Sequence, residues 1–206
     1  MPSNPGSIKQ KIFPTNHRIL LERRLARHLL HCIGNTLVIG AGHDPYRSKL
    51  QNASKIVTND IDSKLDNIDI VSPAENIPQN NSTFDSVVAI EVFEHVRDMK
   101  QCIKECARLL KPGGVLYFTM PFMFHIHADP SDFRRLTKDG IKAYLDNNFE
   151  ISEISYYGNA FNVICDILSS CHILMRIFRP FFYIATLIPF SSDKFPSGVT
   201  VLARKK

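Results

Sequence analysis

The sequence predicts an α/β protein with a doubly wound, mostly parallel sheet of seven strands and helices on both faces. Short apolar runs alternate with helical patterns along most of the chain, which is typical of parallel strands joined by crossover helices. The first run ends in Gly40-Ala41-Gly42, and the next ends in Asp60. Near the C-terminus, 150–157 and 198–203 alternate apolar and polar residues, which predicts an antiparallel last strand at one sheet edge.

Length and composition fit one folded domain. The chain has 206 residues, of which 44% are hydrophobic and 22% charged, as in ordinary globular proteins. Residues 1–16 are rich in Pro, Asn and Ser, so we expect a flexible arm there. We expect residues 17–206 to form a single domain.

The predicted elements follow in order. From His17 to Ile33, leucines recur among arginines, which predicts an amphipathic helix that packs beside the first strand and ends at Gly34. The apolar runs predict strands at 36–40, 55–59, 68–71, 84–90 and 114–120. Helical patterns lie at 45–51, 95–110 and 137–146, and Leu110-Lys-Pro-Gly-Gly114 ends the second of these.

A mostly apolar insert at about 159–189 precedes the last strand. The residues that interrupt it are Asp166, His172, Arg176, Arg179 and Pro180. Its longest uninterrupted apolar run is too short to cross a bilayer. We expect helices that pack over the sheet or the active site, and two alternatives stay open: a homodimer surface and a peripheral membrane contact.

The charge distribution, the cysteines and the N-terminal residues indicate which binding partners and which cellular location to expect. The net charge is +5, but the basic residues are scattered, so we expect no nucleic-acid partner. The five cysteines form no CxxC pair, and Cys102 and Cys106 are expected to be buried thiols on one helix face. Because the N-terminal residues lack the apolar core of a secretory signal, we expect a cytoplasmic location, with membrane attachment through the insert left open.

The glycines and the following acid suggest a nucleoside site. Gly40 and Gly42 let the backbone approach a ligand, and Asp60 at the next strand tip can accept both ribose hydroxyls. A dinucleotide-dependent oxidoreductase would use a similar pattern. However, Pro45 occupies the position of the third glycine, which argues against that function.

Two further motifs, Asp85–Val96 and Leu109–Phe118, lie at the expected distances from these residues. Together the segments resemble the class I S-adenosylmethionine-dependent methyltransferases, in particular the broad type 11 group. The likeness runs from about Gly34 to Tyr157 and resumes at the last strand. It implies a Rossmann-like fold, S-adenosyl-L-methionine as cofactor, and an enzyme that transfers a methyl group.

The resemblance also implies roles for individual residues. Gly40, Ala41 and Gly42 would lie under the methionine part of the cofactor. Asp60, followed by Ile61, would hold the ribose, with Asp62 as the alternative acid. Ala74 and Glu75 would face adenine. Glu91, at the tip of the fourth strand, would face both cofactor and cleft, and Glu94-His95 would open the next helix.

Two positions depart from the family pattern. Val38 replaces an acid that helps to hold the cofactor's ammonium group, and Pro73 replaces the acid near adenine. They leave open a degenerate relative that binds or assembles, on a membrane for example, without catalysis.

The segment Met120–Thr137 follows the fifth strand and gathers histidines, acids and arginines beside the expected cleft. It resembles the pattern H-x-x-P-x-D-[YF]-x-R-[FYL]-T of methyltransferases encoded with polysaccharide and glycolipid assembly enzymes. The matching residues are His127, Pro130, Asp132, Phe133, Arg135, Leu136 and Thr137. This resemblance implies a small-molecule acceptor, such as a sugar or glycolipid.

A hydroxyl acceptor needs a base, and an imidazole suits that task. We expect His127 to be the base, with His125 as second candidate, while Asp132 and Arg135 pair to fold the loop. We expect no metal. The alternative is that His125 and His127, with Asp129, bind a metal that steadies a diol. The leading hypothesis is therefore methyl transfer to a hydroxyl.

Overall fold

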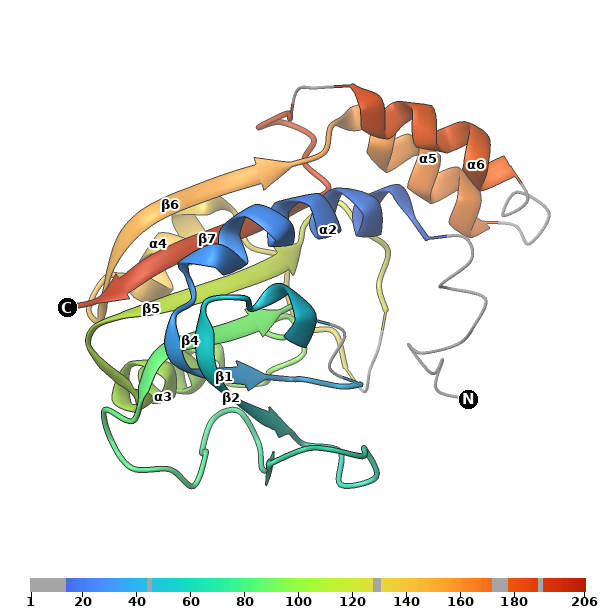
Figure 1. Ribbon diagram of the computed structural model, residues 1–206. Coiled ribbons are helices and arrows are strands. Elements are labelled where there is room, and N and C mark those ends of the chain that lie inside the picture. Colours follow the sequence, from blue (N-terminus) through green and yellow to red (C-terminus); the bar gives the residue numbers. More distant parts are fainter. Residues whose placement is uncertain (1–13, 44–45, 128–130, 172–177, 189–190) are drawn as a thin grey trace.

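The computed structural model describes residues 14–43, 46–127, 131–171, 178–188 and 191–206. One sheet runs through the protein in the order β3-β2-β1-β4-β5-β7-β6 (Figure 1). Its strands are β1 (Gly34–Ile39), β2 (Ala53–Asp60), β3 (Ile70–Val71), β4 (Phe84–Ile90), β5 (Leu110–Pro121), β6 (Phe149–Tyr157) and β7 (Gly198–Lys205).

The helices lie on both faces of this sheet. The α-helices are α2 (Asn16–His28), α3 (Met99–Leu109), α4 (Lys138–Leu145), α5 (Ala160–Cys171) and α6 (Arg179–Phe182). The shorter 3-10 helices are η1 (Leu29–His31), η2 (Arg47–Lys49) and η4 (Tyr183–Leu187). Among the described residues, no helix has both the length and the apolar character needed to span a membrane.

The predicted sheet is confirmed. β3, β2, β1, β4 and β5 pair in parallel, and β7 runs antiparallel to both β5 and β6. All seven expected strands are present. β5 begins at Leu110 rather than 114 because Leu110 already pairs with Phe84 of β4, and the register then shifts across the Pro-Gly-Gly segment before pairing resumes at Val115. The carboxyl ends of the parallel strands therefore meet at one edge, where α/β proteins bind ligands.

Two of the predicted helices are shorter in the structure. The helix predicted at 95–110 begins only at Met99, since Asp98 caps it by accepting a 3.0 Å hydrogen bond from the Gln101 N–H. Glu94 and His95 therefore lie in a turn and not in the opening of the helix. The helix predicted at 45–51 is reduced to η2, and residues 44–45 lie outside the described part.

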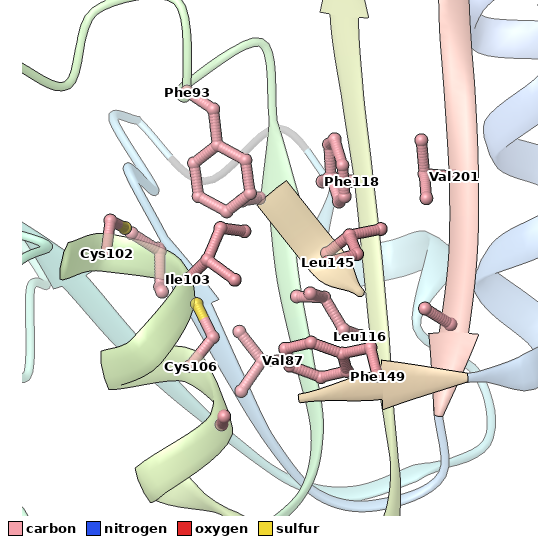
Figure 2. Packing of buried hydrophobic residues seen from close by; sticks show 14 of the residues in the cluster. Val87, Phe93, Cys102, Ile103, Cys106, Leu116, Phe118, Leu145, Phe149 and Val201 are labelled. Atoms are coloured by element: carbon pink, nitrogen blue, oxygen red, sulfur yellow. The ribbon is translucent and has the colours of Figure 1, made fainter. Parts of the chain in front are cut away.

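Two apolar cores lie on the two faces of the sheet. The first lies under α3 and α4, where α3 directs Cys102, Ile103 and Cys106 toward Val87 and Leu116 of the sheet (Figure 2). The two cysteines are fully buried, as predicted. The second core lies under α2, which crosses the opposite face.

The N-terminal helix packs on the sheet as predicted. Its Leu21, Leu25 and the following Leu29 are buried in the second core. The helix begins at Asn16, which is only 2% exposed, so the arm predicted for 1–16 ends earlier than expected. Residues 1–13 of that arm lie outside the described residues.

Between β6 and β7 the chain forms the predicted helical insert, consisting of α5, α6 and η4 in its described residues. These helices lie beyond α2, at the end of the molecule toward which the arrows of the parallel strands point (Figure 1). The insert therefore stands beside the edge at which the candidate site residues gather.

Candidate active site

The loop after β1 turns sharply at its two glycines. Gly40 and Gly42 have φ angles of +63° and +55°, which favour glycine. A Cβ on Gly40 would lie 2.5 Å from Val92 Cγ2, so the absence of a side chain lets this loop contact the segment after β4. At Gly42 no atom lies within 4 Å of a hypothetical Cβ, which leaves space beside the loop.

Asp60 joins this loop to the tip of β2. Its Oδ2 accepts a 2.9 Å hydrogen bond from the Gly42 N–H, and its Oδ1 accepts one of 3.0 Å from the Asp62 N–H. A carboxylate has about four lone-pair positions, so each oxygen can still accept a hydroxyl. The predicted loop and acid thus come together, and Asp60, rather than Asp62, contacts the glycine loop.

The tip of β3 lies next to Asp60. The buried Asn59 side chain donates to the Ile70 and Ser72 carbonyl oxygens, and the Ser72 N–H donates to the Asp60 carbonyl oxygen at 3.0 Å. Ile61 is 67% exposed although it is apolar, so it offers an open surface beside Asp60. Ala74 follows on the β3 side, half-buried against the first core.

Glu75 is half-buried next to Ala74, and its carbonyl oxygen accepts a 3.4 Å hydrogen bond from Gln101 Nε2 of α3.

Glu91, directly after β4, has a left-handed backbone with a φ of +55°. For a residue other than glycine this conformation costs about 1–3 kcal/mol. Thr119 of β5 holds it in place: the Glu91 N–H donates to the Thr119 carbonyl and hydroxyl oxygens, and the hydroxyl donates to Oε1 at 2.9 Å. On the other side, His17 Nε2 lies 2.9 Å from Oε2.

Two carboxyl groups at the end of β4 have pKa values shifted in opposite directions. Burial would raise the pKa of Glu91, but the charge and hydrogen bond of His17 and the hydrogen bond of Thr119 hold it below its ordinary value. Burial, together with the charge of Glu91, raises the pKa of Glu94 well above its ordinary value. Glu94 therefore retains a proton to higher pH than Glu91 does.

The loop after β5 is tied to the turn after β4. Arg134 donates to the carbonyl oxygens of Phe93, Val96 and Arg97, and the Phe133 N–H donates to the Glu94 carbonyl oxygen at 2.8 Å. These contacts hold the loop against the end of β4.

Asp132 and Arg135 form the predicted pair. Arg135 Nη1 donates to Asp132 Oδ1, and Nη2 donates to Oδ2 at 2.7 Å. Burial alone would raise the pKa of Asp132, but Arg135 and the His127 N–H hold it at about 2. The ion pair also fixes His127, because the same Oδ2 accepts the His127 N–H at 3.1 Å.

The His127 ring presents one nitrogen as a proton acceptor. Its Nδ1 lies 3.3 Å from the His125 carbonyl oxygen and 3.4 Å from Asp132 Oδ2, so the Nδ1–H has acceptors and Nε2 is left without a proton in the neutral ring. Burial is the main cause that lowers the pKa of His127 below 6.5. The neutral form that a base requires is therefore present at pH 7.

His125 and Phe124 complete the aromatic side of this loop. The Phe124 ring lies 4.2 Å from the His125 ring, 5.6 Å from His127 and 4.6 Å from His17, centre to centre. Burial, followed by the charges of His127 and His17, lowers the pKa of His125. His125 is more exposed than His127, and Asp129 lies outside the described residues.

The described residues contain one group of side chains with metal-binding potential, namely Glu94, His95 and His127, whose donor atoms lie within 4.8 Å of one another. His95 Nδ1 donates to the Ser131 carbonyl oxygen at 2.5 Å, so both histidines direct Nε2 toward Glu94 Oε1, at 3.6 and 3.9 Å. Of the set considered from sequence, His127 belongs to this group and His125 does not, while Asp129 lies outside the described residues.

Sequence reasoning missed His17 as a residue of the site. His17 belongs to α2, but its ring contacts Glu91, the Tyr157 hydroxyl and Ser197 Oγ. His17 and Glu91 are separated by 74 positions, so no local pattern signals this pair.

The two departures from the family pattern have different surroundings. Val38 is buried under α2 in the second core, where an ionised acid would be costly. Pro73 is exposed at the tip of β3. Neither side chain blocks the space beside Gly42.

Comparisons with known proteins agree with the fold and the motifs. Residues 37–118 match a family model described as "Methyltransferase domain". The mitochondrial ubiquinone biosynthesis O-methyltransferase of Rattus norvegicus is 44% identical over 50 residues, which cover 24% of this chain and 14% of that protein. The matches to several curated relatives of this name span between 14% and 20% of their length.

Solved structures share the fold over nearly the whole chain. A methyltransferase dependent on S-adenosylmethionine from Archaeoglobus fulgidus has a TM-score of 0.64 at 14% identity, covering 95% of this chain and 97% of that one. A similar enzyme of Mesorhizobium loti has a TM-score of 0.62 at 14% identity, with coverages of 91% and 99%.

Proposed function

We propose that this chain, whose residues 37–118 match the family model described as "Methyltransferase domain", transfers a methyl group from S-adenosyl-L-methionine to a hydroxyl of a small-molecule acceptor. The family and the fold imply S-adenosylmethionine as the cofactor. The acceptor class that we propose, a sugar or glycolipid, rests on the likeness of the loop after β5 to such enzymes.

One observation carries the cofactor assignment: the meeting of the Gly42 N–H and the Asp60 carboxylate at the tips of β1 and β2. The residues there fit the cofactor. Open space lies beside Gly42, Asp60 retains acceptor positions for a ribose diol, and Ile61 is exposed where an adenine ring can pack. Gly40 and Ala41 continue the cradle, and Ala74 and Glu75 would border the base.

The bound cofactor supplies an electrophilic methyl group on a sulfonium. The chain then has two tasks, which are to align the acceptor and to remove its proton. His127 Nε2 would take the hydroxyl proton, and the imidazolium that forms would be stabilised by Asp132 beside Nδ1. The arrangement follows the same logic as a histidine base oriented by a buried acid.

Glu91 would act on the opposite side of the cleft. We propose that its carboxylate, kept ionised by His17 and Thr119, orients the acceptor or the cofactor's amino group. Because Gly40 contacts Val92, the neighbour of Glu91, the cofactor loop and this carboxylate lie close together. His125 is the second candidate for the base.

The direct test is incubation of the purified chain with methyl-labelled S-adenosylmethionine and separate saccharide, glycolipid and small-phenol fractions. We expect label in the saccharide or glycolipid fraction, in an alkali-stable ether. Label found only in the phenol fraction would support the proposed methyl transfer but contradict the proposed sugar or glycolipid acceptor. If no fraction is labelled while the cofactor binds, the chain is a binding protein with the same fold.

A further inference from the structure

Helix α5 exposes most of its large apolar residues, and its buried side mixes polar residues with Val163 and Cys165. Its buried positions include the polar residues Asn162, Asp166 and Ser169, which are at most 5% exposed. The large apolar residues on its other side, Phe161, Ile164, Ile167 and Leu168, are 43–52% exposed. A helix on the surface of a globular protein normally turns its apolar stripe inward, so this outward stripe calls for an apolar partner.

The segment of α6 and η4 continues this surface. Phe178, Phe181, Ile184 and Leu187 follow one another at intervals of three residues, which places them along one side, and they are 49–71% exposed. Both α6 and η4 pack against α5. We call these eight exposed apolar residues, which lie on α5, at the N-cap of α6, on α6 and on η4, the insert face.

Polar contacts on the inner side fix this orientation. Asp166 accepts the backbone N–H groups of Asn16 and His17, each at 2.7 Å, and so caps α2. Arg23 of α2 donates to the Thr186 carbonyl oxygen of η4, and the Tyr183 hydroxyl donates to Pro14. Turning the insert over to hide its apolar side would break all of these bonds.

The charge around the insert face is positive. From Asn159 to Pro189 the sequence contains a single acidic residue, Asp166, and its side chain is buried. Beside η4 lies a cavity of about 410 Å³, which the side chains of Arg23 and Arg24 share with Leu20, Leu187 and Ile188. Each guanidinium has five N–H donors, and the recorded bonds use only some of them.

We propose that the insert face binds peripherally to an anionic lipid bilayer, with a headgroup phosphate received at Arg23 and Arg24. The apolar side chains would enter the boundary between headgroups and acyl chains, as those of interfacial helices do. The charges favour this partner over a second copy of the chain, because a symmetric dimer through this face would bring the same arginines together. This inference does not depend on the methyl-transfer reaction.

Vesicle sedimentation tests the proposal with the full chain. We expect binding to phosphatidylcholine vesicles that contain about one third phosphatidylglycerol, and much weaker binding to phosphatidylcholine alone. The double variant Ile184→Ser/Leu187→Ser should bind anionic vesicles about tenfold more weakly or worse. The matched control Leu30→Ser/Ile33→Ser changes two exposed aliphatic residues outside the insert face and should bind like the parent.

The arginine component is tested separately. Arg23→Gln/Arg24→Gln should weaken binding to anionic vesicles about tenfold, whereas Lys100→Gln/Lys104→Gln, which removes the same charge from α3, should not. Melting curves check that each variant is folded. The proposal is overturned if the parent chain does not bind anionic vesicles, or if Ile184→Ser/Leu187→Ser binds them equally well. The parent chain could instead form a dimer in solution and fail to bind vesicles. If Ile184→Ser/Leu187→Ser then dissociates that dimer, the insert face binds a second copy of the chain.

Discussion

The Gly42 N–H and Asp60 Oδ2 are joined by a 2.9 Å hydrogen bond that links the loop after β1 to the tip of β2. The two residues are 18 positions apart in the sequence, and parallel pairing of β1 with β2 brings them to the same sheet edge. This contact holds the glycine loop and Asp60 together in the proposed cofactor site. A substitution of Asp60 should therefore change cofactor binding.

Asp60→Ala should weaken S-adenosylhomocysteine binding about 10- to 100-fold, because each hydrogen bond to a charged group contributes about 1.5–3 kcal/mol. Isothermal titration calorimetry measures this loss. Asp62→Ala is the matched control, since Asp62 lies two residues later and its carboxylate accepts only the exposed Lys64 N–H among the recorded bonds. A larger loss in Asp62→Ala would transfer the ribose role to that residue.

His127→Ala should reduce kcat by about two to four orders of magnitude, the usual contribution of a general base, while cofactor affinity stays close to that of the parent. His125→Ala serves as the comparison and should have the smaller effect. Turnover is measured with the acceptor that the labelling experiment identifies, and cofactor affinity is measured by calorimetry. The two measurements together separate loss of catalysis from loss of binding. Unchanged turnover in His127→Ala would show that the base lies elsewhere.

The pH profile should report the His127 imidazole. Burial lowers its pKa below 6.5, and only the neutral ring accepts a proton, so kcat/KM should be level near pH 7 and fall as the pH drops through that pKa. The charge of Asp132 raises the pKa of His127, so Asp132→Asn should move the acid limb to lower pH. Asp139→Asn, on the exposed side of α4, is the control. An acid limb above pH 6.5 in the parent would contradict this assignment.

Asp166→Ala should lower the free energy of unfolding by about 1–3 kcal/mol. The substitution leaves two backbone N–H groups at the start of α2 without their acceptor, and both bonds are buried. Urea unfolding followed by circular dichroism measures the change. Asp139→Ala, whose carboxylate is almost fully exposed, should stay within about 0.5 kcal/mol of the parent. Equal stability of the Asp166 and Asp139 variants would refute the capping role.

The sheet could be predicted because each strand carries its own signal. Apolar runs mark β1, β4 and β5, and alternation marks β6 and β7. The glycine turn was also predictable, since the positive φ angles of Gly40 and Gly42 suit few other residues. The 3-10 helix η2 was predicted as a longer helix because its polar and apolar spacing resembles an α-helical turn.

Contacts between distant residues could not be predicted in this way. Asp166 caps a helix that begins 150 positions earlier, and the Glu91 carboxylate is held by His17 of α2 and Thr119 of β5. These side chains meet through tertiary packing, which periodicity in the sequence does not report. The orientation of α5 could not be predicted for the same reason. Its large apolar residues suggest an inward stripe, but the contacts of Asp166 with Asn16 and His17 leave most of them exposed.

The most direct measurement for the cofactor site is calorimetric titration of the chain with S-adenosylmethionine and S-adenosylhomocysteine. We expect one site per chain for each ligand, with affinity that falls in Asp60→Ala and is retained in His127→Ala. If neither ligand binds to the folded parent chain, then Gly40, Gly42 and Asp60 do not form a cofactor site, and the proposed methyl transfer is wrong.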